Sequence, residues 1–171
     1  MTPQSRSRLG IALASACGVA ALAIAAFAPP RPCVVYNASD SVPVGWYRIE
    51  QAGELRAGDI VLTRLPAGAA ALADQRGYLP ANVPLLKRIG AVPPQHVCVR
   101  GGSVRIDGEQ VAVALRADRW QRPLPRWPQC RRLAEDELFL LSTAHPASFD
   151  SRYYGPVPAA GVIGRARPWR Q

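Results

Sequence analysis

Short apolar runs, alternating or continuous and separated by turn residues, fill the chain from residue 33 onward. The dipeptide Asp107-Gly108 stands between two alternating runs, which is a strong signal for a two-residue hairpin turn. An alanine-rich stretch at 67–76 is the helix expected in this part, and the proline-rich stretch 116–132 is expected to form a long loop or inserted excursion. The runs predict strands at 33–36, 45–50, 59–62, 85–91, 97–99, 103–106, 109–113, 137–142 and 162–167.

The first part of the chain has a different pattern. Residues 9–28 carry no charge, and at about 1.5 Å per residue they would cover about 30 Å, the thickness of a bilayer core. Arg6 and Arg8 precede this segment, which places the tail 1–8 in the cytoplasm. We therefore expect one N-terminal transmembrane helix that acts as a signal-anchor, with residues 31–171 as an extracytoplasmic domain.

The apolar segment has two alternatives to a retained anchor: a cleaved signal peptide and a buried core helix. Ala26-Phe27-Ala28 has the form of a signal-peptide cleavage site. Pro29 would follow that cut, and proline after the scissile bond is processed poorly, which favours the anchor. A buried core helix should have a polar face, whereas this segment offers only Ser15 among small and apolar residues.

Composition supports a folded, mainly β domain and favours a membrane surface over nucleic acid as a partner. Hydrophobic residues make up 49% of the chain, and 17 prolines with 14 glycines argue against a helical bundle. The net charge of +9 comes almost entirely from arginine, spread without a block of five basic residues. Such spread charge suits an anionic membrane surface, and with no recognisable nucleic-acid module we expect no nucleic-acid partner.

The cysteines indicate a disulfide rather than a metal site. None of the four forms a C-x-x-C pair or stands at metal-ligand spacing from a histidine, so no metal is expected. Cys17 lies inside the apolar segment. Outside the cytoplasm a disulfide is permitted, and we expect Cys98 to pair with Cys130, which would pin the excursion to the sheet. Pairing through Cys33, or three unpaired thiols, are the alternatives.

Candidate chemistry begins at Ser41, in a segment whose composition alone fits a polar turn. A serine needs a base to become a nucleophile. No G-x-S-x-G elbow is present, and a triad built on His145 has no support beyond that residue's presence. Lys87 is the single lysine and lies in an apolar run, where desolvation would lower its pKa. The ordinary alternative is an edge-strand lysine that points to water.

Four segments, taken in order, resemble the signal peptidase family with a Ser-Lys dyad. They are most similar to the TraF-type peptidases of conjugal transfer, which mature pilin subunits. Two departures are V-P-P-Q at 92–95, where L-P-G-D is usual, and S-T-A-H-P at 142–146 in place of G-D-N-R-D. The matching segments are S-V-P-V-G-W-Y at 41–47, G-D-I-V at 58–61, L-K-R-I-G at 86–90 and S-F-D-S-R-Y-Y-G-P-V at 148–157.

The resemblance implies a role for each matching residue. Ser41 would attack the scissile carbonyl, and Lys87 would be its general base. Ser148 would orient the lysine amine. Ser39 would form the oxyanion hole with the backbone N–H of Ser41. Two further residues would support the site as an ion pair: Asp150 and Arg152.

The resemblance also implies a signal-peptidase-like β domain and a function. The chain would be a serine endopeptidase of the inner membrane, with its domain on the periplasmic side, that processes pro-pilin or similar exported precursors without a cofactor. The conjugation or secretion apparatus is a candidate partner. A general signal peptidase for secreted preproteins and a catalytically silent assembly module are the alternatives. The coexistence of Ser41, Lys87 and Ser148 argues against the silent module.

Overall fold

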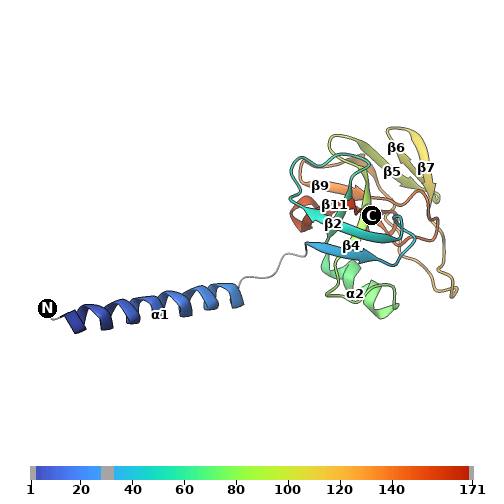
Figure 1. Ribbon diagram of the computed structural model, residues 1–171. Coiled ribbons are helices and arrows are strands. Elements are labelled where there is room, and N and C mark those ends of the chain that lie inside the picture. The colour runs from blue at the N-terminus through green and yellow to red at the C-terminus, as the bar shows by residue number, and fades with distance from the viewer. Residues whose placement is uncertain (1–2, 28–32, 170–171) are drawn as a thin grey trace. The chain divides into compact units, whose positions relative to one another are not determined.

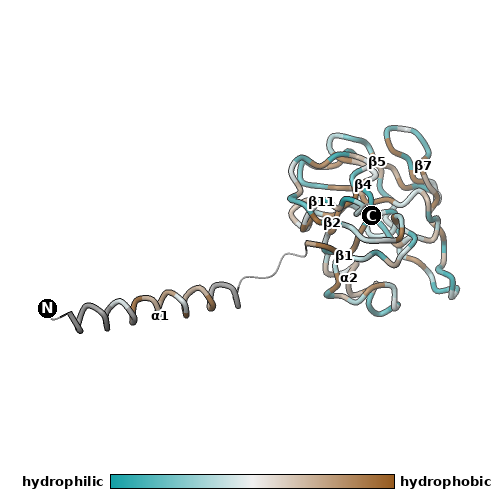
Figure 2. Tube along the Cα trace, viewed as in Figure 1, coloured by the Kyte–Doolittle hydropathy of each residue, from teal (hydrophilic) through white to brown (hydrophobic). Residues whose placement is uncertain are grey.

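The computed structural model describes residues 3–27 and 33–169, which fall into two units, Met1–Pro32 and Cys33–Gln171. The first unit contains α1, Pro3–Phe27, whose coloured part is mostly pale to brown in the hydropathy view (Figure 2). Among the described residues, no helix has both the length and the apolar character needed to cross a membrane. The expected span 9–28 ends at Ala28, which lies outside the described residues. The membrane anchor therefore stays a prediction.

The second unit is built mainly from two antiparallel sheets (Figure 1). The larger has the order β1-β2-β11-β3-β4-β9-β10 and the smaller has the order β7-β6-β5-β8. The strands are β1 Val34–Asn37, β2 Gly45–Glu50, β3 Ile60–Thr63, β4 Leu85–Ala91, β5 His96–Arg100, β6 Ser103–Ile106, β7 Glu109–Val113, β8 Cys130–Arg132, β9 Glu137–Leu140, β10 Val157–Pro158 and β11 Val162–Pro168. Short helices complete the unit: α2 Ala67–Gln75, α3 Ser151–Tyr154 and the 3₁₀ turn η1 Ala159–Gly161.

The mainly β class is confirmed, and most predicted strands lie within one or two residues of their expected limits. The hairpin between β6 and β7 turns at Asp107 and Gly108, whose φ angles of 50° and 90° are those that an Asp-Gly turn supplies. Four short elements were missed: β8, β10, α3 and η1. Each has four residues or fewer, which is too short for a periodic pattern to show.

The lysine strand lies in the interior of the larger sheet. β4 is paired on one side with β3, where Lys87 faces Val61, and on the other side with β9. All four residues of β3 are buried, so both faces of the sheet are covered here. Gly90 lets β4 lie close to Leu141, which follows β9, because a Cβ at position 90 would lie only 2.7 Å from Leu141 Cβ. The edge-strand alternative for Lys87 is therefore wrong.

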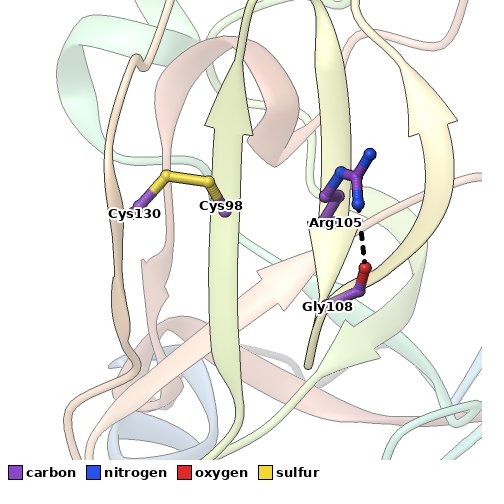
Figure 3. The surroundings of a disulfide bond; sticks show 4 residues. All are labelled: Cys98, Arg105, Gly108 and Cys130. Carbon is purple, nitrogen blue, oxygen red and sulfur yellow. Dashed lines mark hydrogen bonds between the residues drawn. A yellow bond between two sulfur atoms is a disulfide. The ribbon is translucent and has the colours of Figure 1, made fainter.

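A disulfide joins the smaller sheet to the end of the proline-rich excursion. Cys98 on β5 and Cys130 on β8 are direct partners in the antiparallel register and are bonded through sulfur (Figure 3). This is the expected pairing, and Cys33 takes no part in it.

Candidate active site

The polar residues expected at the site meet at one cavity of about 360 Å³. They come from three separate segments: the loop after β1, strand β4, and the loop that precedes α3. Asp150 and Arg152 do not line this cavity, and the disulfide lies elsewhere, in the smaller sheet. The residues brought together at the cavity are Ser39, Ser41, Lys87 and Ser148.

Asn37, at the end of β1, organises the loop that carries the two serines. Its amide nitrogen donates to three backbone carbonyls, those of Ser39 at 2.7 Å, Val42 at 2.9 Å and Pro43 at 3.1 Å. Its amide oxygen therefore faces Ser39 and accepts from both the backbone N–H at 3.1 Å and the hydroxyl at 2.9 Å. This role of Asn37 was not predicted from the sequence. The signal was an asparagine at the start of a turn, where its side chain commonly bonds the backbone.

The hydroxyls of Ser39 and Ser41 are 3.0 Å apart. The single hydrogen of the Ser39 hydroxyl is donated to Asn37, so the hydrogen between the two serines must come from Ser41. The Ser41 proton thus points to Ser39 rather than to a base. For Ser39 to act as an oxyanion donor, its hydroxyl must turn away from Asn37, which would still hold the Ser39 backbone N–H.

Lys87 is buried, with 2% of its surface exposed, and its amine donates to Ser148 Oγ at 2.7 Å. Burial lowers the pKa of this amine from 10.5 to about 8. The charge of Asp150 opposes that lowering, and the charge of Arg152 adds to it. With a pKa near 8, about a tenth of the amine is neutral at pH 7. A neutral amine has a free lone pair, which a general base requires.

The buried pair of Asp150 and Arg152 holds the loop that carries Ser148. Arg152 Nε donates to Asp150 Oδ1 at 2.7 Å, and both side chains have 1% exposure or less. Asp150 also accepts from the backbone N–H of Ser142 at 3.0 Å, and Arg152 Nη2 donates to the Ser142 carbonyl at 2.6 Å. The pair therefore fixes the chain directly after β9.

Arg152 reaches two further segments. Its Nη1 donates to the carbonyl of Val113, in β7, at 2.8 Å and to that of Pro146 at 3.1 Å. Ser148 is then placed within this loop by its own N–H, which donates to the His145 carbonyl at 3.0 Å. A buried guanidinium with these partners supports the geometry around Ser148.

The rest of the cavity lining mixes apolar side chains with the ionisable side chains of Asp40, Asp118, Arg119 and His145. One wall was not expected from the sequence. Residues of the proline-rich excursion line it, with Trp120 and Leu124 among them, beside Tyr78 from the turn after α2. In the described part of the chain, no group of three or more His, Cys, Asp or Glu side chains could hold a metal ion. The cavity presents serine hydroxyls and the single lysine amine, together with the imidazole of His145 and the carboxylates of Asp40 and Asp118.

Comparison with known proteins gives consistent relatives. The family described as signal peptidase, peptidase S26, matches residues 6–170. A probable conjugal transfer protein TraF of Sinorhizobium fredii is 34% identical over 167 residues, covering 93% of this chain and 86% of that protein. A plasmid transfer protein TraF of Escherichia coli is 31% identical over 160 residues, covering 88% of this chain and 89% of that protein. A signal peptidase I structure from Enterococcus faecalis aligns with a TM-score of 0.40 and 18% identity, covering 67% of this chain and 98% of that one.

Proposed function

This chain belongs to the signal peptidase family, peptidase S26, and on that premise we propose that it is a membrane-anchored serine endopeptidase with a Ser-Lys dyad. Its substrate would be pro-pilin or a similar exported precursor used in conjugative transfer. One observation carries the proposal: Ser41, Lys87 and Ser148 line a single cavity, and burial lowers the pKa of the Lys87 amine to about 8. Relatives named as conjugal or plasmid transfer proteins support the transfer role.

In the first step, the Ser41 hydroxyl turns from Ser39 toward Lys87. The neutral amine of Lys87 takes the hydroxyl proton while Ser41 Oγ forms a bond to the carbonyl carbon of the scissile peptide. The product of this step is a tetrahedral intermediate with a negative oxygen, beside a lysine ammonium. Ser148 keeps the amine in place, because its hydroxyl accepts a hydrogen bond from Nζ in either protonation state.

The negative oxygen would be stabilised by the backbone N–H of Ser41 and the hydroxyl of Ser39. Each such donor is typically worth about 3 kcal/mol in the transition state. The hydrogen bonds from Asn37 to three backbone carbonyls would hold the loop conformation while the Ser39 hydroxyl leaves Asn37 and turns to the negative oxygen.

Collapse of the intermediate would break the peptide C–N bond. The Lys87 ammonium gives its proton to the leaving amine and becomes neutral again, leaving an acyl group on Ser41. Water then attacks the acyl carbon with Lys87 as the base, which releases the carboxyl product and restores the Ser41 hydroxyl.

The proposal includes a location. Residues 9–28 would anchor the chain in the inner membrane, with 1–8 in the cytoplasm and 31–171 in the periplasm. The uncharged stretch and the arginines before it support this orientation. The disulfide between Cys98 and Cys130 is compatible with an oxidising compartment. Protease added to spheroplasts should degrade the 31–171 domain; a domain that is protected until the cells are lysed would contradict this location.

The direct test is to incubate the purified full chain with candidate pro-pilin and analyse the products by mass spectrometry, with Ser41→Ala as the control. Cleavage by the parent protein alone supports the proposal, and a product lighter by one water than the linear fragment would reveal joining of its ends. Cleavage only of a preprotein with a secretory signal peptide would indicate a general signal peptidase. Equal, background cleavage by both proteins would contradict an enzymatic role.

A further inference from the structure

One wall of the cavity is a compact hairpin-like segment, residues 116–124. A β-bridge between Ala117 and Pro123 closes it, and the backbone N–H of Asp118 donates to the Arg122 carbonyl at 3.0 Å. The segment is therefore an ordered element, although its composition predicted only a loop.

Asp118 ties this wall to the turn after α2. Its side chain is 7% exposed, and Oδ1 accepts from the backbone N–H groups of Trp120 at 2.9 Å and Arg122 at 3.0 Å. Oδ2 accepts from Tyr78 OH at 2.5 Å and Arg122 Nε at 2.7 Å. Burial by itself would raise the pKa of Asp118, but the hydrogen bonds from Tyr78, Arg122 and Trp120 together hold it well below its usual range. The carboxylate is thus charged and fully occupied at neutral pH.

The same residues form a stack of rings and cations beside the catalytic loop. The rings of Tyr78 and Trp120 are nearly parallel, at 13°, with centroids 6.3 Å apart. The Arg122 guanidinium lies 4.5 Å from the Trp120 centroid and 5.4 Å from that of Tyr78. Tyr78 in turn contacts Phe149, whose centroid is 5.3 Å away and which directly follows Ser148. The wall is therefore continuous with the loop that holds Lys87.

The guanidinium groups of Arg119 and Arg122 lie 3.8 Å and 4.5 Å from the centroid of the Trp120 ring, yet the side chain stays partly open. It is 49% exposed although it lines the cavity, and its other lining neighbours include Leu79, Leu115 and Leu124. An apolar side chain of a bound peptide is stabilised when it is buried against a flat aromatic ring and aliphatic neighbours. An alanine side chain has little apolar area to bury, so it gains little at such a surface. Arg122 is already paired with Asp118, whereas Arg119 also lines the cavity and lies over Trp120, so the apolar contact surface here comes from Trp120 and the aliphatic side chains beside it.

We propose that Trp120 and Tyr78 form a subsite that selects an apolar side chain larger than alanine in the peptide substrate, with Asp118 as the positioning residue of that wall. The inference rests on the proposed function in one respect, that the ligand is a peptide. It predicts that the wall governs peptide affinity, and that proton transfer by Lys87 is independent of it.

Peptide binding by the Ser41→Ala full chain tests this without requiring cleavage. The probes are labelled decapeptides of alanine and serine in which each position in turn carries Ala, Leu or Phe, and anisotropy gives the Kd. At one position, Leu or Phe should bind about tenfold more tightly than Ala. Adding Trp120→Ala or Asp118→Asn should abolish that preference. Matched controls should retain it: Trp169→Ala, an exposed tryptophan that does not line the cavity, and Glu137→Gln, which is paired with Arg131 outside it.

A preference that survives in Trp120→Ala would overturn the inference, as would a scan in which no peptide with Leu or Phe binds better than its alanine counterpart. If Asp118→Asn does not fold, as judged by its melting curve, Trp120→Ala still decides. In the active protein, Asp118→Asn should raise KM while the pH midpoint of kcat stays where it is. A shifted midpoint would place Asp118 in the catalytic machinery and contradict the positioning role. Loss of cleavage in Ser41→Ala bears only on the proposed function, so the two can fail separately.

Discussion

Lys87 Nζ donates a 2.7 Å hydrogen bond to Ser148 Oγ across 61 residues of sequence, and both groups are buried. The partner of the amine is thus a neutral hydroxyl, which orients the amine without stabilising its charge as a contacting carboxylate would. The negative charge of Asp150 raises the pKa of Lys87, but Asp150 is paired with Arg152, whose positive charge acts in the opposite direction. This relationship explains how the site can hold a lysine amine that is partly neutral near neutral pH, as the proposed general base requires.

The pH dependence of cleavage should report the Lys87 amine. If its neutral form is the base, kcat/KM should rise about tenfold per pH unit below about pH 8 and level off above it. Asp150→Asn should move the midpoint to lower pH, because the Asp150 charge raises the Lys87 pKa. Initial rates between about pH 6 and about pH 10 measure both. A profile that is already flat below neutral pH would indicate a different base.

Burial of Lys87 should also cost stability, in a pH-dependent way. Its folded pKa of about 8 lies below its unfolded value of 10.5, so the unfolded state binds more protons between these values and the free energy of unfolding rises with pH there. Below about pH 8 the full cost is present, on the order of 3 kcal/mol. Lys87→Met should therefore be inactive yet about 1–3 kcal/mol more stable at pH 7, since the lost bond to Ser148 offsets part of the gain.

Urea unfolding of the parent protein and of Lys87→Met, at pH 7 and near the unfolded pKa of lysine, measures the difference in their free energies of unfolding. The greater stability of Lys87→Met should shrink toward the higher pH. An equal or lower stability of the variant at pH 7 would mean that the lysine is not buried in a costly state.

The residues of the site could be predicted through the resemblance of four segments to a known family, whereas composition alone favoured a polar turn at Ser41 and left Lys87 as a possible edge-strand lysine. Gly90 and the apolar residues around Lys87 form an interior strand, and the run after Ser148 closes into a capped helical turn. The directions of the hydroxyl protons could not be predicted. They follow from Asn37, whose bonds to the loop backbone become visible only once the turn is folded.

The cavity wall shows a second limit. The proline-rich composition of 116–132 correctly favours irregular backbone, but composition does not say where such a segment docks. Its position depends on the bond between Tyr78 and Asp118, which are 40 residues apart. Its end forms β8, only three residues long, whose pairing with β5 is reinforced by the disulfide.

The buried ion pair should be costly to break. Asp150→Ala leaves the Arg152 guanidinium buried with carbonyl partners alone, and a removed partner of this kind typically costs about 3–5 kcal/mol. Urea unfolding at neutral pH measures the loss. Glu54→Ala is the matched control, because its pair with Arg56 is exposed and should make no measurable difference. A similar, small effect in both variants would show that the pair does not support the fold.

The disulfide should contribute to stability rather than to catalysis. It closes a loop with a sequence separation of 32, which the chain-entropy model values at about 3–4 kcal/mol. Replacing both Cys98 and Cys130 with alanine should lower the free energy of unfolding by about that amount and leave kcat unchanged at a temperature where the variant is folded. Non-reducing peptide mapping of the parent protein should find the two peptides linked. A linked Cys33 peptide would contradict the pairing.

The most direct test of the account is the cleavage rate of one precursor by the parent protein, Ser41→Ala, Lys87→Ala and the double variant, all checked for folding by circular dichroism. Because a nucleophile and its base act as a unit, each single substitution should lower kcat by about 10⁴-fold or more, and the double variant should be little worse than either. Retention of more than about a tenth of the parent rate by Lys87→Ala, or losses that multiply in the double variant, would contradict the Ser-Lys dyad.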